Sequence, residues 1–284
     1  MFPGTCTNPT RVGEALPQRP CRAVPDDALP YAHWMVGQRV LVLAGTTEAR
    51  LLAQQLTDSG IEVVVSLAGR TAATERLAGE TRSGGFGGVS GLSQFVRSKQ
   101  ITAVVCATHP FAAIMPFHAA AACASTSTPL LRLLRPAWSQ VVGDRWITVA
   151  DLRSAARALV DLGARRVLLT TGRQELRPFA DLGDIAFTIR SIEPPDVRGF
   201  TTVDVVLDRG PFTVDGEHAL LVERSIDVVV SKNSGGSSTA AKLVAAREAG
   251  IPVVMVARPP GPDMTTVMSV DAAVVWLERN TGSG

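Results

Sequence analysis

Aromatic residues and net charge are both scarce in this chain of 284 residues. It contains one Tyr, nine Phe and four Trp, so the stacking platforms that bind single-stranded nucleic acid are not indicated. Its formal net charge is +2, which gives no reason to expect non-specific binding to nucleic acid. Positive charge can therefore matter only locally, beside particular groups.

Cysteines are also few, and their spacing indicates neither a metal site nor a disulfide framework. The four lie at positions 6, 21, 106 and 123, without a C-x-x-C motif or a histidine cluster beside them. Cys106 falls in the apolar TAVVCAT and Cys123 in an alanine-rich stretch, where a thiol commonly serves as a small buried hydrophobe. We expect no metal site and a reducing, cytoplasmic setting.

Long hydrophobic runs are missing as well. No run reaches the roughly 18 apolar residues that indicate a membrane-spanning helix. The nearest approach, residues 101–124, is interrupted by two His and two Pro and predicts a strand, a loop and an alanine-rich helix. Residues 1–35 are proline-rich, without periodicity or a signal-peptide pattern, so we expect a disordered extension.

From residue 38 onward, apolar runs of strand length alternate with helical segments. QRVLVLAG is a nearly continuous apolar run, typical of a parallel strand buried on both faces. The next segment, TEARLLAQQLTDSG, has helical spacing, with Thr47 as its expected N-cap and Gly60 as its expected stop. The residues expected on its buried face are Ala49, Leu52, Ala53 and Leu56.

The same alternation restarts near residue 144, at DRWITVAD. Strands alternating with helices of this length favour parallel sheets with right-handed crossovers. We therefore predict an α/β protein of two Rossmann-like domains with mainly parallel sheets, residues 36–140 and 144–280, facing a central cleft. Ligands of such sheets bind beyond the carboxyl ends of the strands, where every polar or glycine-rich loop of this chain falls.

Several loops of the first half could hold a dinucleotide. AGTTEAR has one glycine where a dinucleotide fingerprint has three, and its hydroxyl groups can supply what the missing glycines leave out. SLAGRT ends the second predicted strand, where a carboxylate would select NAD and a basic residue accommodates the extra phosphate of NADP. Because this loop offers Arg70 and no carboxylate, we expect NADPH. SGGFGG could pack along the cofactor.

The candidate cofactor-binding residues are Gly45, Thr46, Thr47, Glu48, Ser66, Gly69, Arg70, Gly85, Phe86, Gly87, Thr108 and His109. Each loop also has a reading without a ligand, as a capped helix start, a surface arginine or a tight turn. His109, in ATHPFA, is a candidate proton donor or cofactor partner, and a structural role is the alternative.

Three loops of the second half, TTGRQE, DRGPF and SKNSGG, each place a cation or an amide beside glycine. SKNSGG is not a Walker loop, because its lysine comes before the glycines and not after them. Three such loops at one rim would bind an anion with several separated charges, such as a ligand rich in carboxylates. The candidate substrate-binding residues are Arg173, Gln174, Arg209, Lys232, Asn233, Ser234 and Gly235.

Taken in order, AGTTEAR, LAGRT, GGFGG, ATHPFA, RP-x-W, TTGRQE, RGPF and SKNSGG resemble the motifs of the precorrin-6A reductase family of cobalamin biosynthesis. This family also includes cobalt-precorrin-6A reductases, which the motifs do not separate. The resemblance runs from about Arg39 to Pro259, with one mild departure at Ala44, where members often have glycine.

The resemblance implies that NADPH lies mainly against the first domain and a tetrapyrrole with several carboxylates lies between the two. Hydride transfer to one carbon of a macrocyclic double bond, with a proton added to its neighbour, would give precorrin-6B. Arg173, Arg209 and Lys232 could pair with the carboxylates, and His109, Lys232 and solvent are the candidate proton donors. Transient contacts with neighbouring pathway enzymes are a further expectation.

Two other functions fit parts of the sequence. One is a non-catalytic sensor of NADP(H), although a sensor has no need for the three basic loops of the second half. The other is an NADP-dependent reductase of a different polyanionic substrate. NADPH oxidation that depends on the substrate would separate an enzyme from a sensor.

Overall fold

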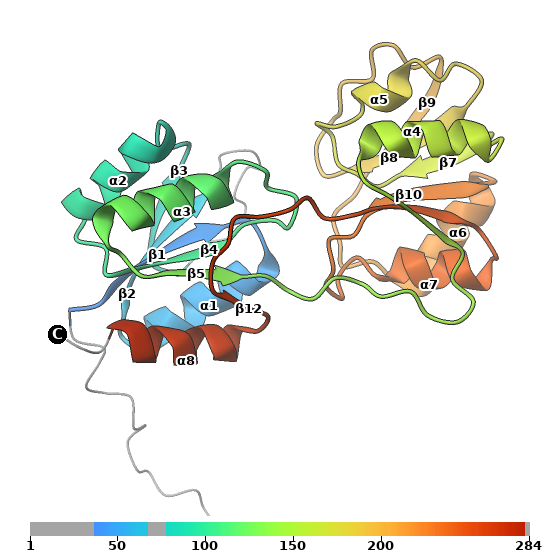
Figure 1. Ribbon diagram of the computed structural model, residues 1–284. Helices are drawn as coiled ribbons and strands as arrows, with labels where there is room; N and C mark the ends of the chain where they lie inside the picture. Colours follow the sequence, from blue (N-terminus) through green and yellow to red (C-terminus); the bar gives the residue numbers. More distant parts are fainter. Residues whose placement is uncertain (1–36, 68–77, 282–284) are drawn as a thin grey trace, which may run out of the picture.

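The computed structural model describes residues 37–67 and 78–281; the expected N-terminal extension, Gly69 and Arg70 lie outside these ranges. The described residues form two six-stranded sheets in separate lobes, with eight helices (Figure 1). Neighbouring strands within both sheets are parallel, which confirms the predicted fold class. None of the described helices is long and apolar enough to cross a membrane.

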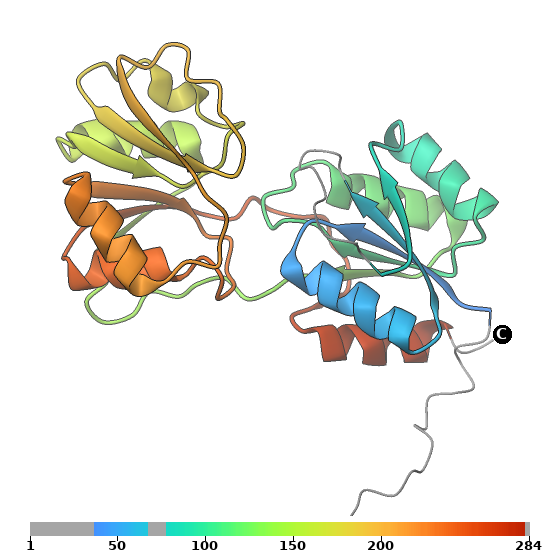
Figure 2. The ribbon, with the colours of Figure 1, turned by 180° about the vertical axis from the view of Figure 1, so that it is seen from behind.

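The first sheet has the strand order β12-β5-β4-β1-β2-β3. Its strands are β1 (Arg39–Ala44), β2 (Glu62–Leu67), β3 (Glu80–Ser83), β4 (Ala103–Ala107), β5 (Leu130–Leu133) and β12 (Thr266–Val267). Two helices, α1 (Thr47–Asp58) and α8 (Val270–Thr281), cover one face, as the view from behind also shows (Figure 2). The other face is covered by α2 (Gly88–Ser98) and α3 (Met115–Thr126).

The second sheet has the order β6-β11-β10-β7-β8-β9. Its strands are β6 (Trp146–Val149), β7 (Arg166–Leu169), β8 (Ala186–Ser191), β9 (Thr202–Leu207), β10 (Val228–Lys232) and β11 (Val253–Val256). One face packs against α4 (Leu152–Asp161) and the short α5 (Arg177–Ala180). The other packs against α6 (Val214–Glu223) and α7 (Ala241–Glu248).

The chain returns to the first sheet at its C-terminal end, which differs from the expected second domain of residues 144–280. Strand β12 pairs with β5, and the fully buried Ala273 and Leu277 of α8 join the core beneath α1. Helical periodicity shows which face of a helix is apolar, but it does not show which sheet that face covers. Two connections, residues 134–145 and 257–265, therefore run between the lobes (Figure 1).

Helix α1 shows how local sequence positions the first loop. The four residues expected on its inner face are all buried, as the spacing predicted. Its N-cap is Thr46 and not Thr47, because the Thr46 side chain accepts a hydrogen bond from the backbone N–H of Ala49. The expected stop is confirmed, since Gly60 adopts a positive φ of 83° directly after the C-cap.

Both sheets have a crevice where the strand order reverses, since helices on either side of that point diverge. In the first sheet this crevice lies between β1 and β4, and in the second between β7 and β10. The loops that follow these four strands contain AGTTEAR, ATHPFA, TTGRQE and SKNSGG. The topology thus places four of the expected functional loops at two crevices.

We predict that Leu52→Ala will lower the free energy of unfolding by about 2–5 kcal/mol, because it leaves a cavity in a closely packed core. Leu52 is 0% exposed between the first sheet and α8, whereas its neighbour Leu51 is 57% exposed. Leu51→Ala is the matched control and should change stability by less than about 0.5 kcal/mol. Equal losses for the two variants in urea unfolding would contradict the packing described for α1.

Candidate functional site

The loops after β1 and β4 touch at the first crevice. A Cβ placed on Gly45 would lie 3.0 Å from the backbone nitrogen of His109 and 3.4 Å from the Cα of Thr108. Thr46 also joins the ends of β1 and β4, since its hydroxyl donates a hydrogen bond to the carbonyl of Ala107 at 3.2 Å. This close approach explains why residue 45 is glycine. The Thr46 hydroxyl is used in the hydrogen bonds of the turn, whereas Gly45 is exposed to solvent.

At the far side of the first sheet, an arginine outside the expected set holds the glycine-rich loop. Arg82 Nη1 donates to Ser66 Oγ at 2.9 Å and to the carbonyl of Gly84 at 3.0 Å, and Nη2 donates to the carbonyl of Gly85 at 3.0 Å. Its guanidinium carbon lies 3.8 Å from the centre of the Phe86 ring. In the sequence, the signal for Arg82 was a basic residue directly before SGGFGG. It lies in the short strand β3, which the sequence analysis did not predict.

The second crevice contains an ion pair between Lys232, at the end of β10, and Glu175, in the loop after β7. Lys232 Nζ also lies 5.2 Å from the centre of the Phe111 ring. Phe111 belongs to the loop after β4 of the first sheet, yet it packs against the core that α4 and α5 form with the second sheet. The two crevices therefore meet, and the segment 109–111 is where they do so.

His109 and Lys232, the two candidate proton donors, differ in their electrostatics. Burial lowers the pKa of His109 to about 4, helped by the positive charges of Lys232, Arg135 and Arg258. Its Nδ1 accepts a hydrogen bond from the backbone N–H of Phe111 at 3.2 Å, so the neutral ring carries its proton on Nε2. Burial lowers the pKa of Lys232 to about 8, which leaves its ammonium mostly charged at neutral pH.

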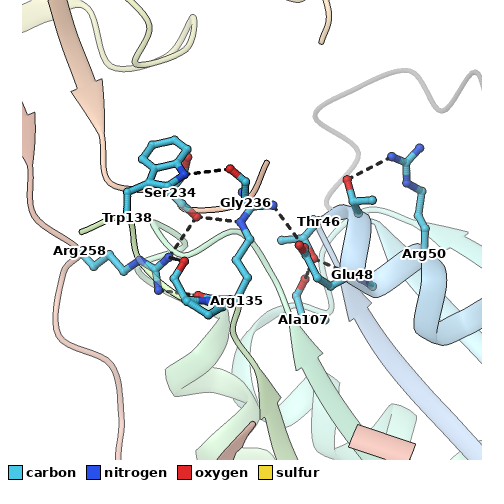
Figure 3. Close-up of polar contacts among 12 residues, drawn as sticks. Thr46, Glu48, Arg50, Ala107, Arg135, Trp138, Ser234, Gly236 and Arg258 are labelled. Carbon is cyan, nitrogen blue, oxygen red and sulfur yellow. Dashed lines mark hydrogen bonds and ion pairs between the residues drawn. The ribbon is translucent and has the colours of Figure 1, made fainter. Parts of the chain in front are cut away.

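The SKNSGG loop is hydrogen-bonded to the connection between β5 and β6. Asn233 Oδ1 accepts from the backbone N–H of Trp138 at 2.8 Å, and Asn233 Nδ2 donates to its carbonyl at 3.0 Å. The Trp138 indole donates to the carbonyl of Gly236 at 2.9 Å, and Arg135 Nε donates to the carbonyl of Ser234 at 2.8 Å (Figure 3). Two of the expected ligand residues, Asn233 and Ser234, thus bind the connection.

Arg258, from the second connection, fastens the loop further. Its Nε donates to the carbonyl of Asn233 at 2.8 Å, and its Nη2 donates to the carbonyls of Ser234 and Pro136, each at 3.1 Å. A Cβ on Gly235 would lie 2.0 Å from the Pro136 oxygen, so the loop passes too close for any side chain. Lys232, which precedes these fastened residues, instead approaches Phe111 of the first lobe.

Arg135 also ties this loop to the first helix. Its Nη1 lies 3.2 Å from Glu48 Oε2, and the two side chains are only 13% and 22% exposed (Figure 3). Glu48 is in the first turn of α1, where the positive end of the helix dipole favours a carboxylate. Neither Arg135 nor Arg258 was among the expected site residues. Their shared sequence signal is an arginine directly before a proline, and one lies in each of the two connections between the lobes.

The other expected substrate-binding residues lie in the loops that follow β7 and β9 of the second sheet. Arg173 forms an ion pair with Glu193 at 2.7 Å, and Gln174 and Arg209 are exposed. The backbone N–H of Arg209 donates to Asp208 at 2.7 Å. Among the described residues, no three His, Cys, Asp or Glu side chains gather in a way that could hold a metal ion.

Comparisons with known proteins show the family to which the sequence and fold are similar. The family model described as "Precorrin-6x reductase CbiJ/CobK" matches residues 39–278. The precorrin-6A reductase of Rhodococcus erythropolis is 50% identical over 241 residues, which cover 84% of this chain and 97% of the relative. That of Rhodobacter capsulatus is 43% identical over 240 residues, 84% of this chain and 95% of the relative.

A more distant relative and a solved structure extend the comparison. The cobalt-precorrin-6A reductase of Priestia megaterium is 29% identical over 232 residues, covering 78% of this chain and 90% of the relative. The solved structure described as CobK precorrin-6A reductase is 41% identical and superposes with a TM-score of 0.82. It covers 87% of this chain and 98% of its own.

We predict that His109 will stay neutral down to about pH 4 in an NMR titration of its ring. Removing a nearby positive charge by Lys232→Met should raise its pKa, whereas Lys99→Met, in a pair with Glu80 elsewhere, should not. The unfolded chain takes up this proton near the ordinary pKa of 6.5, so the contribution of His109 to stability should be lost as pH falls from about 6.5 toward 4. A His109 pKa near 6.5 in the wild-type protein would contradict the described site.

We predict that Gly235→Ala will destabilise the protein far more than Gly250→Ala. Both glycines have a positive φ, 68° and 66°, so alanine costs about 1–2 kcal/mol of backbone strain at either position. Only at Gly235 does the added methyl group also meet backbone, whereas nothing lies within 4 Å at Gly250. Thermal unfolding measures the difference, and equal melting temperatures would show that the loop after β10 is not held as described.

Proposed function

The chain belongs to the precorrin-6x reductase family, and we propose that it reduces precorrin-6A to precorrin-6B with NADPH in cobalamin biosynthesis. The observation that supports this most is the contact of the two crevices, which brings His109 and Phe111 beside Lys232. A site of that kind serves a reaction between two ligands, one held by each sheet. The higher identity to precorrin-6A reductases, 50% and 43% against 29%, supports a metal-free substrate.

The residues at the carboxyl end of the first sheet fit a dinucleotide. Gly85 has an ordinary negative φ and nothing within 4 Å of the position a Cβ would take, so the described fold itself does not require glycine there. Open space over bare backbone suits a flat or phosphate-bearing ligand. Gly45 differs, because a Cβ there would meet the backbone of His109, but it is exposed at the start of α1, whose N-terminus favours an anion.

NADPH, when bound, supplies the hydride that reduces one carbon of the macrocyclic double bond. Gly45 and the start of α1 would hold its pyrophosphate, with Thr46 shaping the turn, while Glu48 stays paired with Arg135 beside it. Thr108 and His109 lie across the crevice from Gly45 and would border the nicotinamide. The neutral His109 can donate a hydrogen bond from Nε2, but it cannot act as a cationic acid at neutral pH.

The second lobe would bind the carboxylates of the tetrapyrrole in a cleft between the lobes. Arg173 follows β7 and Arg209 follows β9, and their guanidinium groups could pair with acetate and propionate side chains there. Arg173 already contacts Glu193, so a substrate carboxylate would take the place of that partner. Asn233, Ser234 and Gly235 would act indirectly, by setting the position of Lys232.

Lys232 is the proton donor that we propose. Its ammonium faces the segment 109–111, and its pKa of about 8 makes it both charged and acidic enough to give up a proton near neutral pH. The proton goes to the carbon next to the one that receives the hydride, which balances the reduction. Glu175, at the solvent side of Lys232, can then help to return a proton from water.

The two other functions have no observation in their favour. A sensor does not explain the meeting of the crevices, and a reductase of another polyanion does not explain identities of 43–50% over almost the whole length of precorrin-6A reductases. The cytoplasmic setting and transient contacts with neighbouring pathway enzymes remain predictions.

The proposed activity is tested by following NADPH absorbance with purified protein and precorrin-6A. We expect oxidation of NADPH that depends on both protein and substrate, with one equivalent consumed per precorrin-6B formed. NADPH that binds without being consumed in the presence of precorrin-6A would favour the sensor.

We predict that Lys232→Met will lower kcat by about 10²–10⁴-fold, the usual contribution of a positioned acid, without changing the Kd for NADPH. Lys232→Arg keeps the positive charge but not the acidity, so kcat should fall while KM for precorrin-6A stays near the wild-type value. In wild-type protein, kcat should decrease as pH rises above about 8, because Lys232 then loses its proton.

Lys99→Met serves as the control, since Lys99 pairs with Glu80 away from both crevices, and it should leave every constant unchanged. If Lys232→Arg restored the wild-type kcat, Lys232 would act only by its charge, and the proton would have to come from solvent.

A further inference from the structure

Arg82 is a cation that the proposed reaction does not yet use. It is the third residue of the edge strand β3, and its register partner on β2 is Ser66. In parallel sheets neighbouring strands lie about 4.8 Å apart, so Arg82 lies about 10 Å from the β1 turn, measured across the sheet. In a dinucleotide-binding sheet the adenosine ribose lies over the end of the second strand. Arg82 therefore lies on the ribose side of the proposed cofactor site.

The guanidinium group of Arg82 is held rigidly. Three hydrogen bonds, to Ser66 Oγ and to the carbonyls of Gly84 and Gly85, fix one edge of it. One face lies against the Phe86 ring, which is itself packed edge-on against Phe95 of α2 with 5.2 Å between ring centres. Such a group loses little further freedom when it binds an anion.

This fixed cation has no carboxylate partner among residues 37–67 and 78–281. Glu80, on the same strand, pairs instead with Arg39 at 2.7 Å and with Lys99 at 3.3 Å. Within those ranges the three hydrogen bonds use both N–H groups of Nη1 and one of Nη2, so Nε–H and the second N–H of Nη2 have no acceptor. With two available N–H donors and a positive charge that no carboxylate neutralises, this guanidinium group is suited to bind a phosphate monoester.

From this geometry we propose that Arg82 binds the 2′-phosphate of NADPH and thereby sets the preference for NADPH over NADH. The inference rests on the proposed cofactor and adds a residue to it. Ser66 is consistent with this role, because a serine beside Arg82 adds no negative charge, whereas a carboxylate at this strand end would repel the phosphate. The open space beside Gly85 lies next to the same guanidinium.

A purely structural role for Arg82 predicts a different result from a phosphate contact. If Arg82 only shaped the glycine-rich loop, its loss would weaken NADPH and NADH together, because both cross that loop. If it binds the 2′-phosphate, its loss weakens NADPH alone. The ratio of the two affinities is therefore the decisive quantity, and it stays informative even if the variant is somewhat less stable.

The test is a fluorescence titration of the full chain with NADPH and with NADH, together with calorimetry using 2′,5′-ADP and 5′-AMP. We expect wild-type protein to prefer NADPH and 2′,5′-ADP. Arg82→Gln should weaken both of these about 10- to 100-fold and change NADH and 5′-AMP by less than about threefold, as expected for loss of a hydrogen bond to a charged group. Arg82→Lys should give an intermediate loss.

One control shares the chemistry of the substitution. Arg97→Gln, on α2, removes an arginine that bonds the Ser125 carbonyl, and it should leave the preference intact. The proposal is overturned if Arg82→Gln weakens NADPH and NADH equally, or if Arg70→Ala abolishes the preference while Arg82→Gln retains it. Wild-type protein that binds NADPH and NADH equally also overturns it but leaves a cofactor site; binding of neither would overturn the proposed cofactor itself.

Discussion

The hydrogen bonds by which Arg135 and Arg258 hold the loop after β10 are the constraint on which the rest of the site depends. Both arginines come from the connections between the sheets, and both donate to carbonyl groups of that loop. Arg135 also forms an ion pair with Glu48 in the first turn of α1, so one side chain contacts both α1 and the loop after β10. Lys232 faces the first lobe because the residues after it are fastened in this way.

The charge distribution follows from the same arrangement. Burial lowers the pKa of His109, and the positive charges of Lys232, Arg135 and Arg258 lower it further, so the imidazole stays neutral at neutral pH. A substrate with several carboxylates would supply the missing negative charge, so binding and electrostatic compensation coincide. In the proposed reaction, the first lobe would offer bare backbone and a neutral ring to the cofactor, and the second would offer cations to the substrate. On this proposal, the two halves need different loops at their corresponding reversals of strand order, between β1 and β4 and between β7 and β10.

Much of the fold could be predicted from the sequence, and the exceptions have physical reasons. The continuous apolar runs of β1 and β4 and the periodicity of α1 are properties of neighbouring residues, and they were read correctly. Strand β3 escaped notice because, as a mostly exposed edge strand, it carries no apolar pattern. The sheet that α8 covers could not be predicted, because both sheets offer an apolar face.

The site divides in the same way: loops at strand ends were predictable, but contacts across the chain were not. Arg135 and Ser234 are 99 positions apart, and an arginine that binds a carbonyl leaves no local pattern. Asn233 has the residue type of a ligand-binding amide, yet both polar atoms of its side chain bind Trp138.

The most direct test of the account is a crystal structure with NADP⁺ and precorrin-6B. It should place the nicotinamide beside His109, in contact with the macrocycle, and Lys232 Nζ at the protonated carbon; ligands out of contact in separate crevices would contradict it.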